Sequence, residues 1–475
     1  MVTLQFPTRR RLLAMVASVA VLLGATACGD DRSADRTGGD APVTEADRRY
    51  GQAPAPHREV TYQPDVVIVG GGGRSVRSVT PDGLTWRIDP RAKRAAELAR
   101  GRVMFITGRG VGRVIDVRRD GDDLAVTVGP VAITEVIRDG RFTSDRPVPF
   151  DRMVANPAGE PFWAEAEEGT SGAGGSGGGG GGPLPGRSKT ARIPAGKFNV
   201  TPTCCATGIG LHFTYDSGGI RLVGTLELMF EKPSGTFDLV IDNGSVKKAM
   251  FEVTGGTGLR LDVEGGSALG AGHNINRRIT IPVDFAVPLG TFLGVPFSAT
   301  VNQSLTIQTA FSAKDGNIKA NARYGFSGKL GFGYQNGSFD AWKPAGFQVQ
   351  DSLTNSITGI SVGVNGLLFA YQARLHVGIG AFGFSTGLYV GLTASVGVTM
   401  GSALGAPLTV CRGATLNLFT DYGVGYRLPT AVVKVINLFL RVFEAKPIEA
   451  EGGIGGTANV LNRNEVIPDV PLCRK

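Results

Sequence analysis

The sequence predicts a mainly β protein, with a small strand-rich N-terminal domain and a large antiparallel β-sandwich or barrel-like domain that contains few helices. Three observations support this fold class. Glycine accounts for 71 of the 475 residues, against a usual share of about 7%. Apolar and polar residues alternate over long stretches, which is typical of half-buried strands. Turn sequences of the Asn-Gly and Asp-Gly type separate several of these stretches.

The first 27 residues have the features of an export signal. Three arginines, Arg9 to Arg11, precede an apolar run that ends in small residues. The run is too short to span a bilayer comfortably, and a charged region followed by a short apolar region is typical of a cleaved signal peptide. We therefore expect residues 1–27 to be removed during export.

The residues at the cleavage site, Ala25-Thr26-Ala27-Cys28, resemble the lipobox of bacterial lipoproteins, with alanine where leucine is commoner. The resemblance implies cleavage before Cys28, a diacylglycerol on its sulfur, and an anchor on the extracytoplasmic face of the cell membrane. Acyl chains contribute roughly 0.8 kcal/mol per buried methylene. The alternative is an ordinary secretory signal in which Cys28 is incidental. Arg9 and Arg10 also resemble a twin-arginine export motif, but a plain basic region looks similar.

Two segments have the composition of linkers. Residues 28–60 carry almost no apolar side chains, and residues 163–190 include six consecutive glycines, 177–182. A glycine-rich coil of about 20 residues reaches roughly 25 Å. We expect a disordered tether at 28–60, and a linker at 163–190 that leaves the flanking domains independent in orientation.

The small domain, residues 61–162, contains short apolar runs that predict strands at 65–69, 84–88, 102–107, 112–117 and 123–128. Asp89, Pro90 and Gly101 are suitable cap residues for a short helix between the second and third runs. Arg119-Asp-Gly-Asp122 indicates a hairpin, and residues 133–140 suit one helical turn.

The large domain, residues 191–475, alternates strongly over 219–230, 298–312 and 317–327, which indicates antiparallel strands with one buried and one wet face. Asp242-Asn-Gly244, Lys314-Asp-Gly316 and Gln335-Asn-Gly337 predict hairpin turns. A meander accounts for all of them.

Two segments of this domain depart from the pattern. Between Ile360 and Met400 only Arg374 and His376 are chargeable near neutral pH, which suits core, cavity lining or membrane wall. Residues 429–443 place a narrow polar stripe on an apolar cylinder and predict a helix that packs against or caps the sheet. An amphipathic surface helix or a strand are the alternatives.

The chain has five cysteines. If Cys28 is acylated, an even number remains in an oxidising compartment, which favours disulfides among Cys204, Cys205, Cys411 and Cys473. Because a bond between neighbours strains the backbone, we expect Cys204 and Cys205 each to pair with Cys411 or Cys473, in an order that stays open. We predict no metal site, since no second CxxC or nearby histidine supports one.

Sequences that look catalytic fail in their context. Asp65 to Gly73 resembles the opening of a dinucleotide-binding fold, but no helix follows it, and we predict no cofactor. Gly-x-Ser-x-Gly occurs around Ser176, Ser361 and Ser385, each without the strand, sharp turn and helix of a hydrolase elbow.

Two sets of charged residues have an ordinary and a functional interpretation. Six acids at 227, 238, 242, 252, 262 and 264 alternate along strands. They suit the wet face of a sheet, with paired catalytic carboxylates as the alternative. Thirteen arginines between 74 and 141 are interleaved with acids, which favours a salt-bridged surface over an anion-binding face.

These features lead to one principal functional hypothesis: an exported, lipid-anchored, non-enzymatic envelope protein whose large β domain binds a hydrophobic or amphipathic ligand or another envelope component. The expected partners are the membrane, through the anchor, and lipid or envelope polymer. The net charge of +8 favours an anionic neighbour, but outside the cell nucleic acid is not the expected one. The alternatives are a membrane-inserting β pore or barrel protein and a secreted hydrolase.

Overall fold

The fold was analysed in a computed structural model of the full chain. The structure describes residues 49–80, 83–144, 147–150, 153–157, 193–195, 197–205, 207–269, 274–280, 283–312, 314–360, 363–381, 384–403, 406–427 and 451–474, with positions 437, 441, 447 and 449. The predicted signal peptide and glycine-rich linker lie outside these residues, as does all but the last twelve residues of the predicted tether.

The N-terminal part forms a six-stranded sheet in the order β2-β5-β6-β7-β4-β3. Its strands are β2 (Val66–Ile68), β3 (Val76–Val79), β4 (Thr85–Ile88), β5 (Val103–Thr107), β6 (Gly110–Asp120) and β7 (Asp123–Gly129). Trp86, Ile88 and Met104 are buried in a core of its own. All five predicted strands are present, and the predicted hairpin is the β6–β7 turn, where Asp120 pairs with Asp123.

The predicted helix between β4 and β5 is wrong. Only a 3-10 turn forms there, η2 (Ala95–Glu97), because Arg94 adopts a φ of 65° and interrupts any continuous helix. A second 3-10 turn, η1 (Gly72–Ser75), follows β2. One helical turn, α2 (Ile133–Val136), occurs where it was predicted and leads into β8 (Ile137–Thr143).

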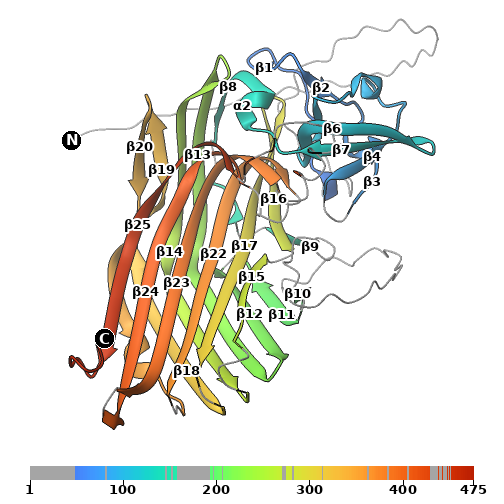
Figure 1. The fold of residues 1–475 in the computed structure, drawn as a ribbon. Coiled ribbons are helices and arrows are strands. Elements are labelled where there is room, and N and C mark those ends of the chain that lie inside the picture. The colour runs from blue at the N-terminus through green and yellow to red at the C-terminus, as the bar shows by residue number, and fades with distance from the viewer. Residues whose placement is uncertain are drawn as a thin grey trace, which may run out of the picture. The chain divides into compact units, whose positions relative to one another are not determined.

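The C-terminal part contains two large, mainly antiparallel sheets, which we call sheet I and sheet II (Figure 1). Sheet I follows the order β10-β11-β12-β13-β14-β18-β21, with β1, β8, β19 and β20 attached. Its remaining strands are β1 (Thr61–Tyr62), β10 (Ile193–Ala195), β11 (Phe198–Thr203), β12 (Gly208–Ser217), β13 (Ile220–Asp242), β14 (Ser245–Ser267), β18 (Gly316–Ser327), β19 (Leu330–Gln335), β20 (Ser338–Trp342) and β21 (Ala345–Asp351).

Sheet II follows the order β25-β24-β23-β22-β17-β16-β9, with β15 attached to β17. Its strands are β9 (Val154–Pro157), β15 (Asn276–Thr280), β16 (Val283–Phe292), β17 (Val295–Phe311), β22 (Val364–Ala381), β23 (Phe384–Ala403), β24 (Ala406–Arg427) and β25 (Glu451–Ile467). A helical turn, α3 (Leu353–Ser356), precedes β22. In Figure 1 the long strands β22 to β25 run side by side.

Sheets I and II pack face to face through aromatic side chains. Ring centroids of Phe213 and Phe369 lie 5.6 Å apart, as do those of Phe332 and Tyr422. One continuous apolar core contains residues from both sheets. These contacts confirm the predicted fold class, a mainly β chain with a small strand-rich part and a large antiparallel sandwich.

Two of the three predicted hairpins are present. Asn243-Gly244 and Asn336-Gly337 have positive φ angles and join β13 to β14 and β19 to β20, as two-residue hairpin turns require. The third turn, around Asp315, is not a hairpin, because β17 belongs to sheet II and β18 to sheet I. A simple meander therefore does not describe the whole domain.

The small and large parts are not independent of one another, contrary to the sequence-based expectation. β8 pairs with β13 in sheet I, and β9 pairs with β16 in sheet II. Ile137 and Phe142 of β8 are fully buried in the sandwich core. Backbone pairing and a shared core thus join the segment before the glycine-rich linker to the segment after it.

The predicted helix at 429–443 lies outside the described residues, apart from Asn437 and Arg441, which are both helical. None of the helices in the described part of the chain is long and apolar enough to cross a bilayer.

Candidate functional site

A cavity opens at one end of the sandwich, and we call it the end pocket. Its volume is about 270 Å³. It is lined by Ala132, Ile133 and Thr134 at α2, Gly244, Ser245 and Val246 at the β13–β14 hairpin, Tyr334 of β19, Val424 and Gly425 of β24, and Gly453 and Ile454 of β25. The lining includes no ionisable side chain other than the Tyr334 phenol. Polar atoms come from three side chains, Thr134, Ser245 and Tyr334, and from backbone groups.

Hydrogen bonds hold the rim of the end pocket in place. The side-chain amide of Gln63 donates to the carbonyl oxygen of Thr134 over 2.8 Å. In the hairpin, the backbone N–H of Gly244 donates to the carbonyl oxygen of Arg138 over 2.8 Å, and that of Asn243 donates to the Asp139 carboxylate over 2.7 Å. The last two bonds connect the β13–β14 hairpin to β8, which directly follows α2, so the two sides of the pocket are held in a fixed relation.

The inner wall of the end pocket continues into the aromatic core. The ring of Tyr334 lies 4.7 Å from that of Phe339, and Phe339 contacts Tyr422 at 5.6 Å between centroids. These rings fill the space between sheets I and II behind the pocket. A ligand in the pocket would contact a wall that is supported by this packing.

Glycines make the β24–β25 side of the pocket. Gly453 has a φ of 117°, and a β-carbon there would overlap the carbonyl oxygen of Val424. Such a conformation favours glycine over every other residue. The two strands consequently pair closely at this point, and the backbone of Gly425 and Gly453 lines the cavity beside Val424 and Ile454.

A second polar constellation is buried on the face of sheet II that points away from the sandwich core. The guanidinium of Arg374 forms an ion pair with the Asp421 carboxylate, whose side chain is only 4% exposed. Gln372 donates to Asp421 over 3.2 Å, and the Arg374 guanidinium lies 5.3 Å from the centre of the Tyr389 ring. His376 packs parallel to Tyr389 at 6.3 Å.

Burial controls the charge state of this group. Burial and, to a lesser extent, the nearby Arg374 cation lower the pKa of His376 from 6.5 to about 3, against a backbone hydrogen bond at Gly425 that raises it. His376 is therefore neutral at physiological pH. A neutral imidazole beside a buried ion pair is typical of a structural network, and the Asp421 carboxylate is already engaged by Arg374.

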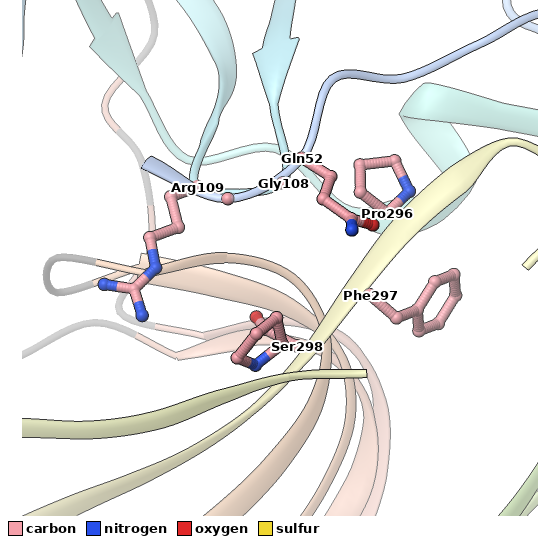
Figure 2. A pocket seen from close by; sticks show the side chains of 8 residues that line it. Gln52, Gly108, Arg109, Pro296, Phe297 and Ser298 are labelled. Carbon is pink, nitrogen blue, oxygen red and sulfur yellow. The ribbon is translucent and has the colours of Figure 1, made fainter. Parts of the chain in front are cut away.

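A much smaller cavity lies where the N-terminal part meets β17 (Figure 2). Its volume is about 10 Å³, which is close to the least that holds one water molecule. Gln52, Gly108 and Arg109 line one side. Figure 2 shows Phe297 and Ser298 projecting to opposite sides of β17. The cavity is too small for an organic ligand.

The cysteines pair differently from the sequence-based expectation. Cys411, near the start of β24, is bonded to Cys473 with Cα atoms 5.4 Å apart, a usual separation for a disulfide. Cys204 is bonded to Cys205, and both are buried at the end of β11 in sheet I. The expected bridges from 204 and 205 to 411 and 473 are thus wrong, because Cys204 and Cys205 follow β11 of sheet I, whereas Cys411 lies on β24 of sheet II and Cys473 follows β25. Cys28 lies outside the described residues.

The motifs with a catalytic appearance remain without a supporting geometry. Ser385 is 8% exposed at the start of β23, a strand that runs on to Ala403, so no elbow forms there. Ser176 and Ser361 lie outside the described residues. In the part of the chain that the structure describes, no group of three His, Cys, Asp or Glu side chains is placed to hold a metal ion.

Most of the charged side chains singled out in the sequence form ion pairs. Four of the six acids have basic partners, in the pairs Asp238–Lys248, Glu252–Lys329, Asp262–Arg260 and Glu264–Lys319. Several arginines of the N-terminal part do likewise, in the pairs Arg77–Asp89, Arg87–Asp120, Arg94–Glu97 and Arg113–Asp65. The salt-bridged surface is the interpretation that these contacts favour.

Comparison with known proteins places the chain in a family. A model of a domain of unknown function, DUF8402, matches residues 180–456, and a second, DUF8403, matches residues 46–139. No curated protein and no solved structure matched the chain. The first match spans more than half of the 475 residues and contains most of sheets I and II. The chain therefore belongs to the DUF8402 family.

Proposed function

We propose that this protein is an exported, lipid-anchored, non-enzymatic envelope protein of a bacterium, and that its β-sandwich binds a hydrophobic or amphipathic ligand in the end pocket. The observation that carries the ligand-binding part is the pocket itself, with a volume of about 270 Å³ and a lining that is more apolar than polar. Cavities that bind small molecules are mostly apolar with a few placed polar groups. Val246, Val424 and Ile454 supply the apolar surface, and Tyr334 with Ser245 supplies hydroxyls.

The size of the end pocket limits the ligand. At about 30 Å³ per water molecule, the cavity corresponds to roughly nine waters. A complete phospholipid does not fit in that volume, whereas one end of an acyl chain or a small amphipathic molecule does. Because the lining carries no full charge, the ligand's charged group, where it has one, would stay outside in water.

The location rests on the N-terminal sequence. Residues 1–27 have the pattern of an export signal, and Cys28 follows a lipobox-like sequence. Acylation of Cys28 would hold the folded part at the outer surface of the cell membrane, where lipids are abundant. Labelled palmitate that enters the full chain but not the Cys28→Ser variant is the expected result. Equal absence of label from both would contradict the anchor.

The ligand-binding part is tested by native mass spectrometry of the full chain, gently extracted from membranes. We expect a mass above that of the acylated protein, from one bound lipid or amphiphile. Val246→Trp places a large ring in the pocket and should remove the extra mass. Val349→Trp is the control, because Val349 is 40% exposed on β21 and does not line the pocket. An unliganded mass for the unaltered protein in several detergents would overturn the proposal.

A further inference from the structure

The outer surface of sheet II contains a broad area without charged side chains, which we call the neutral face. Directly paired residues of antiparallel strands point to the same side of a sheet, so the strand register defines the face. It consists of every second residue of four strands, 304–310 of β17, 366–372 of β22, 393–399 of β23 and 413–419 of β24, together with Asn459, Asn462, Asn464 and Val466 of β25.

Most of the neutral face is on the surface of the described structure, whereas Gly366 and Thr393 are buried. The residues that alternate with it, such as Leu367 and Phe369, are buried in the sandwich core, so the face points the other way. Leu368 and Phe419 on the face are each 37% exposed. Asn459, Asn462 and Asn464 on the edge strand are also exposed.

The composition of the neutral face is unusual for this protein. None of its side chains is Asp, Glu, Lys, Arg or His, whereas about a quarter to a third of an ordinary protein surface is charged. Hydroxyl and amide side chains predominate, and glycine or alanine occupies most of the remaining positions. Only Leu368, Phe419 and Val466 are large and apolar. Of the charges that border the face on the same side, Arg374 and Asp421 neutralise each other, and Arg278 of β15 is exposed beside Thr306 of β17.

This composition excludes several kinds of partner. Nucleic acid and acidic polymers need several cations to offset their charge, whereas the face itself has none and Arg278 is a single cation at its border. Stable protein interfaces have an apolar core, and binding to a bilayer surface requires apolar or basic side chains. The three separated apolar residues of the neutral face are too few for an interface core or for contact with a bilayer. The remaining class is an uncharged, hydroxyl-rich polymer.

We propose that the neutral face binds an uncharged polysaccharide. Amide and hydroxyl side chains both donate and accept hydrogen bonds, as sugar hydroxyls do. The small residues leave a surface on which a chain of sugar rings can lie across several strands, and Phe419 with Leu368 offers apolar contact to the C–H faces of those rings. This site is separate from the end pocket, and the inference does not depend on the ligand proposed there.

The test uses the full chain in detergent and measures its affinity for dextran, soluble starch and soluble mannan, all of them uncharged. We expect at least one polymer to bind, with an affinity that is unchanged when NaCl rises from about 0.05 to about 0.5 M, since no counterions are released. Binding of dextran sulfate, in contrast, should fall steeply over the same range. Failure of all three neutral polymers to bind would overturn the proposal.

Variants locate the binding. Asn462→Asp adds a charge with little change in shape, and Phe419→Ala removes the exposed ring, so each should weaken binding at least tenfold. Asn199→Asp, on an exposed position of β11 in sheet I, is the matched control and should bind normally. Val246→Trp, which fills the end pocket, should also bind normally. Equal binding by Asn462→Asp, Phe419→Ala and the unaltered protein would contradict the proposal. A second contradicting result would be that the unaltered protein binds no polymer but forms a dimer, and that Asn462→Asp dissociates this dimer.

Discussion

Arg374 on β22 reaches Asp421 on β24 across the full width of the strand between them. The residue directly between the two in the register is Gly391 of β23. A β-carbon at Gly391 would overlap an oxygen of the Asp421 carboxylate. The ion pair therefore depends on a glycine in the middle strand, and both charged side chains are more than 85% buried.

Removing one member of this pair should be costly. Asp421→Ala leaves the Arg374 guanidinium buried without its carboxylate, and breaking a buried pair in this way typically costs about 3–5 kcal/mol. Urea unfolding of the variant should show this loss. The double variant Arg374→Met with Asp421→Leu removes both charges and should lose less than the single one. A single variant as stable as the unaltered protein would show that the pair contributes little.

Stability should fall in mildly acidic solution because of His376. Its folded-state pKa of about 3 lies below the usual value of about 6.5. The unfolded chain therefore binds a proton that the folded chain does not, and the free energy of unfolding decreases as the pH falls through this interval. The slope is at most about 1.4 kcal/mol per pH unit for one group.

The variant that tests this is His376→Gln, in which the fall in stability between pH 6.5 and 4 should become shallower. His212→Gln is the control, since His212 is exposed on β12. It should retain the slope of the unaltered protein. Identical slopes in all three proteins would rule out His376 as the source.

Asp238 should stabilise the junction between β8 and sheet I above about pH 4. Burial of its carboxyl raises the pKa, but hydrogen bonds from Lys248 and Thr143 outweigh that effect and leave the pKa below its usual value. The folded state thus favours the carboxylate. Its contribution to stability is present above the unfolded-state pKa and is lost as the pH falls through the folded-state pKa.

Asp238→Asn should therefore lower the free energy of unfolding at pH 7, and the difference from the unaltered protein should shrink below about pH 4. Because Thr143 donates to Asp238 over 2.9 Å, backbone amides of β8 should also exchange faster in the variant. Asp242→Asn, at an exposed position at the end of β13, is the control. It should neither lower the free energy of unfolding at pH 7 nor speed amide exchange in β8. A difference that persists unchanged at pH 2 would contradict this explanation.

Local patterns in the sequence predict the strands well but not their partners. Alternation over 317–327 predicts β18, since one face of that strand is buried throughout. Nothing within the segment specifies that it pairs with β14 and not with β17, which precedes it in the chain. The pairing of β18 with β14 depends on contacts between residues that are distant in the sequence. As a result, the chain passes from sheet II to sheet I at the turn around Asp315.

The candidate site was less predictable than the fold. The end pocket is formed by short pieces of five segments, and glycines such as Gly453 leave no side-chain pattern to recognise. The Arg374–Asp421 pair had a partial signal, because Arg374 is one of only two chargeable residues between Ile360 and Met400. A buried arginine requires an anionic partner, but the sequence does not identify which acid provides it.

The disulfide arrangement gives a direct chemical test of the strand order. Cys411 and Cys473 are 62 positions apart, and the chain-entropy model assigns a bridge of that span about 4 kcal/mol. The variant with Cys411→Ser and Cys473→Ser should lose stability of that order in urea. Proteolytic peptides of the unreduced protein should include one pair linked through these two cysteines and a single peptide that carries Cys204 and Cys205. Peptides that link Cys204 or Cys205 to Cys411 or Cys473 would contradict the arrangement of sheets I and II, because they require the end of β11 to lie beside the start of β24.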